Sequence, residues 1–140
     1  ASRFNLKKGK GGMVDIEFLT QMLQLSHGWR LPALRERGTL DALKALKKEK
    51  IIRASEHRLL SEGYLFLRRL DHRLRLQRDQ SIDTVEREPG ELHGVAQALG
   101  YKGNKKKNPG ELLLRDYEAR RERIRACYQR FFKMSAAEGE

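Results

Sequence analysis

Cysteine, proline and aromatic residues are scarce in this chain of 140 residues. Cys127 is the only cysteine, which excludes an internal disulfide and a cysteine-based zinc site and favours a reducing, cytoplasmic location. The three prolines fall at expected helix boundaries, and aromatic residues make up only 7% of the chain. No apolar run approaches the roughly 20 residues that cross a bilayer, and no hydrophobic signal segment opens the sequence. We therefore expect neither a membrane partner nor secretion.

Residue patterns typical of catalytic and metal sites are also missing. The four histidines are scattered, without His-x-x-x-His or His-x-x-Glu spacing, so we expect no metal site built from this chain alone. No Gly-x-Ser-x-Gly turn is present for a serine nucleophile, and no Asp-x-Asp string is present to hold magnesium beside a triphosphate. We therefore expect no catalytic residue in this chain.

Positive charge, in contrast, is abundant. Lys and Arg number 30 against 19 Asp and Glu, which gives a formal net charge of +11 and a pI of about 10.1. Such a balance suits a phosphate backbone. However, the basic residues are spread along every predicted helix and do not alternate with aromatic side chains, as a base-stacking platform requires. We disfavour nucleic acid as the partner and keep a basic helical module binding nucleic acid or protein as the alternative.

Apolar residues recur every three or four positions, which predicts helices. We expect five of them, at residues 13–27, 40–50, 55–78, 90–99 and 109–133. Thr39, Ser55 and Asn108 are the expected N-caps, and Gly100 is expected just past the end of the fourth helix. Segments 79–88 and 102–107 are interpreted as loops, and no strand pattern is present. Three long helices and one or two short ones predict an all-α, antiparallel helical bundle.

A basic, glycine-rich segment at residues 1–12 precedes the bundle, which we place at residues 13–133, with a frayed tail at 134–140. Gly11 and Gly12 permit close backbone approach, and the helix that follows presents free amides and a positive dipole end. With Lys8 and Lys10 they form a candidate cradle for a phosphate. The segment is not a P-loop, because no Gly-Lys-Ser/Thr follows. The alternative is a linker that caps the helix and carries lysines for solubility.

Asp15 lies in the first turn of the first predicted helix. A carboxylate at this position favours the helix dipole and accepts bonds from free amides, so a structural role is our first interpretation. Glu17 is two residues further and points away from Asp15, so the two do not form a paired-carboxylate site.

Two polar sets are candidates for a network between helices. Glu17, Gln21 and Gln24 form a polar stripe on the first helix, and Arg69, His72 and Arg73 share a face of the third helix. If the two faces meet, their charges must pair, because a buried charge without a partner is costly. The alternative is a pair of solvated helix faces.

The string Gly11-Gly12-Met13-Val14-Asp15-Ile16-Glu17-Phe18-Leu19, with Gln21 and Gln24 after it, resembles the opening of the helical domain of glutamine synthetase adenylyltransferases. Two further stretches agree in the same order, Leu31-Pro32-Ala33-Leu34-Arg35 and Tyr64-Leu65-Phe66-Leu67-Arg68-Arg69-Leu70-Asp71-His72-Arg73-Leu74. The resemblance covers roughly residues 6 to 132. The form of the first motif is most similar to the C-terminal, AMP-attaching half of such enzymes. The helical domain of PII-protein uridylyltransferases, which share Gly-Gly-x-x-Asp, is the second candidate.

The resemblance implies a helical bundle that follows a nucleotidyltransferase domain, with residues 1–12 as the linker to it. It implies a parent enzyme that uses ATP and Mg²⁺ to attach AMP to a tyrosine of glutamine synthetase, also removes it, and answers to the PII protein and glutamine. The Asp15-Ile16-Glu17 element then lies at the junction with the catalytic domain. The loop Ser81-Ile82-Asp83-Thr84-Val85 departs from the family pattern, which puts any function of that loop in doubt.

Overall fold

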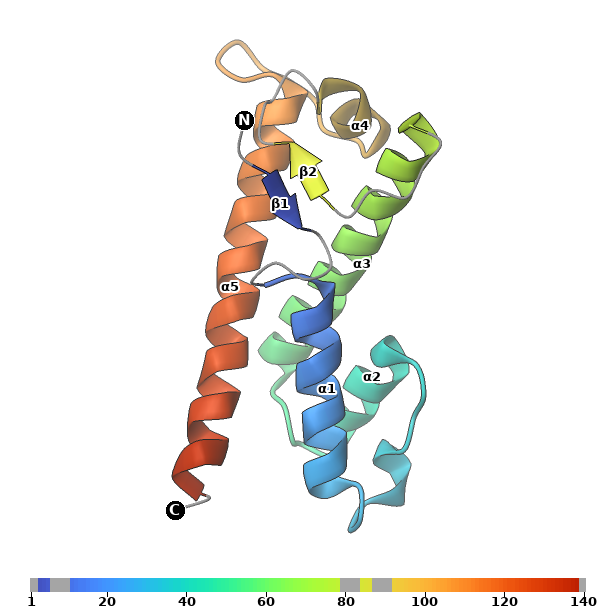
Figure 1. Cartoon of the computed structure of the whole chain (residues 1–140), viewed down its shortest axis with the longest axis vertical. Helices are drawn as coiled ribbons and strands as arrows, with labels where there is room; N and C mark the ends of the chain where they lie inside the picture. Colours follow the sequence, from blue (N-terminus) through green and yellow to red (C-terminus); the bar gives the residue numbers. More distant parts are fainter. Residues whose placement is uncertain (1–2, 6–10, 79–83, 87–91, 139–140) are drawn as a thin grey trace.

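Three long helices dominate the fold and alternate in direction, so the predicted all-α antiparallel bundle is confirmed (Figure 1). The computed structural model describes the backbone of residues 3–5, 11–78, 84–86 and 92–138, and the side chains within 11–76 and 92–133. The elements in chain order are β1 (Arg3–Asn5), α1 (Met13–His27), the 3₁₀ turn η1 (Pro32–Leu34), α2 (Thr39–Lys48), α3 (Ala54–Arg78), β2 (Thr84–Glu86), α4 (His93–Ala98) and α5 (Pro109–Glu138).

The core lies between α1, α3 and α5, where the apolar stripes of the three helices meet. Its fully buried side chains include Ile16, Leu19, Leu60, Leu70, Leu113 and Ile124. Gly63 allows α3 and α5 to approach closely, since a Cβ at this position would lie 2.7 Å from Cδ1 of Ile124. The short helices α2 and α4 extend the core at opposite ends of the bundle (Figure 1).

Local sequence signals place several helix ends correctly. α1 spans the predicted residues, and Asn108 caps α5 by accepting a hydrogen bond from the Glu111 amide at 2.9 Å. Gly100 follows α4 with φ +94°, and the amides of Gly100 and Tyr101 donate to the carbonyls of Gln97 and Ala96. This is the bonding pattern of a Schellman motif, which requires a left-handed residue after the helix.

Other predicted ends are wrong. Thr39 is the first residue of α2 and Gly38 is its N-cap, while α3 begins at Ala54, before the predicted cap Ser55. The side chain of Glu56 accepts the Arg53 amide at 2.8 Å, so a glutamate, not a serine, satisfies this end of α3. α5 continues past its predicted end to Glu138 and takes in most of the predicted frayed tail.

A two-stranded antiparallel ribbon was not predicted. β1 pairs with β2 in the register Arg3↔Glu86, Phe4↔Val85 and Asn5↔Thr84. Strands of three residues are too short to show an alternating pattern, and the partners are distant in sequence. The pairing joins the segment predicted as a linker to the one predicted as a loop. The proposed domain limits themselves stay a prediction.

None of the described helices combines the length and the apolar character needed to cross a bilayer.

Candidate functional site

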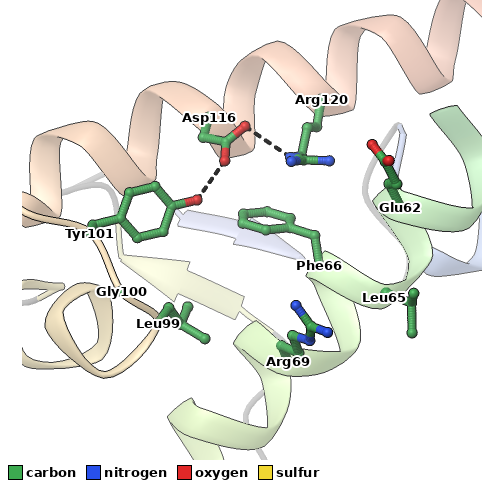
Figure 2. A pocket seen from close by; sticks show the side chains of 9 residues that line it. All are labelled: Glu62, Leu65, Phe66, Arg69, Leu99, Gly100, Tyr101, Asp116 and Arg120. Carbon is green, nitrogen blue, oxygen red and sulfur yellow. Dashed lines mark hydrogen bonds and ion pairs between the residues drawn. The ribbon is translucent and has the colours of Figure 1, made fainter. Parts of the chain in front are cut away.

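A pocket of about 430 Å³ opens between α3, the end of α4 and α5 (Figure 2). Its lining mixes apolar, aromatic and charged side chains: Glu62, Leu65, Phe66, Arg69, Leu99, Gly100, Tyr101, Asp116 and Arg120. Three separate elements supply these residues. The pocket therefore exists only in the folded bundle.

Asp116 holds one wall of this pocket in place. The Tyr101 hydroxyl donates to Asp116 Oδ2 at 2.5 Å, and Arg120 Nε donates to Asp116 Oδ1 at 2.8 Å (Figure 2). The Arg120 guanidinium also lies 4.9 Å from the centre of the Phe66 ring, within cation–π range. Both oxygens of Asp116 are thus engaged, and the segment after α4 is fastened to α5.

Glu62, Phe66 and Arg69 lie on one face of α3, spaced by four and three residues. The side chains of Glu62 and Arg69 make no hydrogen bond or ion pair within the part of the chain that the structure describes. A ligand in the pocket would meet the negative charge of Glu62, the positive charge of Arg69 and the aromatic ring of Phe66. Such an arrangement is suited to binding and orienting a polar molecule. It offers no activated nucleophile or acid–base pair for catalysis.

Tyr101 and Tyr117 predict a loss of stability at alkaline pH. Burial raises the pKa of Tyr117 to about 12, and burial together with the hydrogen bond to Asp116 raises the pKa of Tyr101 well above its usual 10. The folded state favours the neutral phenols, so their stabilisation is complete below pH 10 and is lost as the pH rises through the folded-state values. We expect the urea midpoint to fall steeply between about pH 10 and 12.

Urea denaturation across this pH range, with tyrosinate absorbance recorded in parallel, measures the effect. A double variant, Tyr101→Phe and Tyr117→Phe, should lose less of its stability over the same interval. An equal loss in the double variant would assign the alkaline transition to other groups.

A second, more open groove of about 850 Å³ lies between α1 and α3 and shares Leu65 and Arg69 with the pocket. Glu17 of α1 and Arg69 and His72 of α3 all line it, so part of the predicted polar network shares one groove. The Tyr64 hydroxyl donates to Glu17 Oε1 at 3.5 Å.

The other members of the predicted network lie elsewhere, which corrects that part of the prediction. Gln24 Nε2 donates to the carbonyls of Leu34 and Glu36, both at 2.7 Å, and so fastens η1 to α1. Gln21 lines the hollow on that side of α1, and Arg73 is exposed outside the α1–α3 groove. The reason is position along α1, since Gln24 lies two turns beyond Glu17, about 10 Å further along the axis, within reach of the segment around η1. The functional role of the network stays a prediction.

The N-terminus of α1 is fastened to α5. The Gly11 amide donates to Asp15 Oδ2 at 2.7 Å, and Arg125 Nη1 donates to the same oxygen at 3.1 Å. The structural role expected of Asp15 in the first turn is therefore confirmed. Gly11 and Gly12 are both buried, and the Gly11 amide has a partner within the chain.

Lys8 and Lys10 lie outside the described residues, so the phosphate-side assignment of Lys8, Lys10, Gly11 and Gly12 stays a prediction. Within the described part of the chain, no group of three or more His, Cys, Asp or Glu side chains is arranged to hold a metal ion.

The sequence analysis missed the main residues of the pocket, namely Glu62, Phe66, Tyr101, Asp116 and Arg120. The spacing of Asp116 and Arg120, four residues apart on a predicted helix, indicates an ion pair. No local signal indicates that Tyr101 reaches this pair, because the contact depends on how α4 packs against α5.

Comparison with known proteins gives two results. The family model described as GlnD PII-uridylyltransferase matches residues 1–132. Curated relatives named bifunctional glutamine synthetase adenylyltransferase/adenylyl-removing enzyme include that of Agrobacterium fabrum, 42% identical over 72% of this chain, and that of Stenotrophomonas maltophilia K279a, 44% identical over 69%. The same enzyme of Bordetella pertussis is 38% identical over 69% of the chain. In each case the match covers 10% of the relative, so the chain spans about a tenth of the length of these proteins.

Proposed function

Because this chain belongs to the family described as GlnD PII-uridylyltransferase, we propose that it is the helical domain of an adenylyltransferase that transfers AMP from ATP to a tyrosine of glutamine synthetase. The observation that carries the proposal is the 38–44% identity to enzymes named for this activity. The parent enzyme also removes the AMP, and the domain follows its C-terminal, AMP-attaching nucleotidyltransferase domain. It acts in the cytoplasm, in the control of nitrogen assimilation, and the PII protein is its regulator.

Within that enzyme the bundle binds the protein substrate or regulator and helps to position the catalytic domain. The preceding domain carries out the chemistry. The described residues contain no cluster of carboxylates suited to Mg²⁺, so the metal and most contacts to ATP come from outside this chain. The bonds that Asp15 accepts from the Gly11 amide and from Arg125 support a fixed exit for the linker from the bundle. Such an exit sets the position of the bundle relative to the catalytic domain. We expect the isolated chain to have no transferase activity.

The linker lysines provide the first test of this role. If Lys8 and Lys10 lie beside the phosphates of ATP, the double variant Lys8→Glu and Lys10→Glu in the parent enzyme should raise KM for ATP by about tenfold, because two attractive charges become repulsive. The measurement is the initial rate of labelled AMP transfer to glutamine synthetase over a range of ATP concentrations.

The matched control is the pair Lys105→Glu and Lys106→Glu, which makes the same charge change in an exposed loop. An unchanged KM in the first variant, or an equal rise in both, would contradict the nucleotide-side role of the linker.

A parent enzyme lacking the bundle should lose transfer to glutamine synthetase.

The second candidate is a uridylyltransferase acting on the PII protein, which the description of the matching family model favours. The parent enzyme should be offered both acceptors in turn, glutamine synthetase with ATP and the PII protein with UTP. Labelling of the PII protein by UTP, with none of glutamine synthetase by ATP, would replace the first proposal with the second.

A further inference from the structure

Two large apolar side chains are exposed beside each other at the C-terminal end of α1. Leu25 is 82% exposed, and Trp29, the only tryptophan of the chain, is 75% exposed. Burial of such side chains is favourable, so leaving both in water forgoes a considerable stabilisation. Contiguous exposed apolar residues of this size are typical of interaction surfaces.

These side chains border a groove of about 640 Å³ between α1 and the segment that follows it. The groove is lined by Gln21, Gln24, Leu25, Gly28, Trp29, Arg35 and Glu36. It lies at the C-terminal end of α1, about 20 Å from Met13 at the helical rise per residue (Figure 1). This surface is therefore separate from the turn that Gly11 and Asp15 form at the start of α1.

The walls of the groove are held by hydrogen bonds within the chain. Gln24 Nε2 donates to the carbonyls of Leu34 and Glu36, and Arg35 Nε donates to the Gly28 carbonyl at 3.3 Å. The groove is thus formed before any partner arrives, which lowers the entropy lost on binding. Tryptophan and arginine are also the residue types that most often dominate binding energy at protein interfaces.

Three arginines lie in the groove or close to it in sequence. Arg30 lies 5.9 Å from the centre of the Trp29 ring, Arg35 lines the groove, and Arg37 follows in the same exposed segment. Glu36 is the one carboxylate in this short stretch. In an incoming segment with Asp or Glu around an apolar side chain, the carboxylates would pair with these arginines and the apolar side chain would contact Leu25 and Trp29.

We propose that this groove docks an acidic segment of a partner protein, which inserts an apolar side chain between Leu25 and Trp29. A nucleic acid fits less well. The groove offers a single large aromatic ring where a strand needs several. The proposal does not depend on the identity of the parent enzyme.

Peptide selection on the 140-residue chain tests the chemistry of the partner. Random short peptides displayed on phage are selected on the chain and counter-selected on its Leu25→Ala variant. The expected consensus has one or two large apolar residues flanked by Asp and Glu. A neutral or basic consensus, or no enrichment over the counter-selected variant, would overturn the proposal.

The fluorescence of Trp29 then measures binding of the selected peptide directly. We expect a shift of emission to shorter wavelength and an affinity about tenfold lower for Leu25→Ala, and also for the pair Arg30→Gln and Arg37→Gln. Leu76→Ala is the matched control, since Leu76 is 62% exposed near the C-terminal end of α3. Equal loss in the Leu76 variant, or an affinity that does not fall with added salt, would contradict docking at this groove.

Two further measurements examine other occupants. Sedimentation of the chain alone should show a monomer at concentrations where the peptide binds, and a dimer abolished by Leu25→Ala would mean that a second copy fills the groove. An oligonucleotide should leave Trp29 emission unchanged at matched ionic strength. Quenching by the oligonucleotide that exceeds the response to the peptide would overturn the choice of a protein partner.

Discussion

Replacing Gly11 by alanine should destabilise the bundle by about 3 kcal/mol or more, which is among the larger effects expected of any single substitution. Gly11 has φ +76°, a region that side chains with a Cβ rarely adopt. A Cβ at this position would also lie 2.1 Å from the carbonyl oxygen of Arg121. That oxygen belongs to the backbone of α5 and has no rotamer through which to move away. Either α5 or the start of α1 must shift.

Substitutions at two other glycines distinguish the cost of a positive φ from the cost of the steric clash with α5. Gly100 has φ +94°, and a Cβ added there would meet nothing within 4 Å, so Gly100→Ala should cost only about 1 kcal/mol, for the backbone conformation alone. Gly38 has an extended backbone, and a Cβ there would have its nearest neighbour at 3.6 Å, so Gly38→Ala should be close to neutral. Urea denaturation of the three variants gives the comparison. Equal losses for Gly11→Ala and Gly100→Ala would show that the Gly11 turn does not pack against α5.

This prediction also changes the interpretation of the Gly11-Gly12 pair. From the sequence, close backbone approach to a phosphate and close approach to another part of the chain are indistinguishable, because both require the absence of a Cβ. The structure provides the second reason through the α5 backbone at Arg121. A phosphate role for the linker therefore depends mainly on Lys8 and Lys10.

The features that the sequence predicted are those set by neighbours within one or two turns of helix. The apolar periodicity located α1, and the string Asn108-Pro109-Gly110-Glu111 located the start of α5 through one capping bond. Gly100 marked the end of α4 because only a left-handed residue closes the helix in that way.

The features that it missed depend on contacts between distant segments. The pairing of β1 with β2, the bond from Tyr101 to Asp116, and the two bonds from Gln24 to the segment around η1 all follow from how the helices pack. A polar side chain on a helix has several possible partners, and the sequence alone does not rank them. Gln24 illustrates this: it lies on nearly the same face of α1 as Glu17 but about 10 Å further along the axis, where its partners are the carbonyls of Leu34 and Glu36.

Asp15 combines both kinds of information. Its position in the first turn of α1 predicted a bond to a free amide, and Gly11 supplies that amide. Its second partner, Arg125, is 110 residues further along the chain and was not predictable. The carboxylate is therefore the point where the linker, α1 and α5 are joined.

Replacing Asp15 by alanine should destabilise the bundle by about 2 kcal/mol, because the substitution leaves a buried amide and a partly buried guanidinium without their acceptor. The side chains of Asp15 and Arg125 are 15% and 30% exposed, so solvent compensates only part of the loss. Asp15→Asn keeps an acceptor for the Gly11 amide and should cost about half as much. Urea denaturation provides the free energies of unfolding.

A double-mutant cycle with Arg125→Ala isolates the ion pair, and we expect a coupling energy of about 1 kcal/mol that shrinks as salt is added. The parent enzyme then distinguishes the structural role of Asp15 from the domain-junction role implied by family resemblance. If Asp15 only fastens the turn, the rate of AMP transfer at a temperature well below unfolding should change little in Asp15→Asn. If the carboxylate also orients the catalytic domain, the rate should fall at that temperature although the bundle of Asp15→Asn is still folded. A coupling energy near zero would contradict the fastening of α1 to α5, on which the fixed exit of the linker depends.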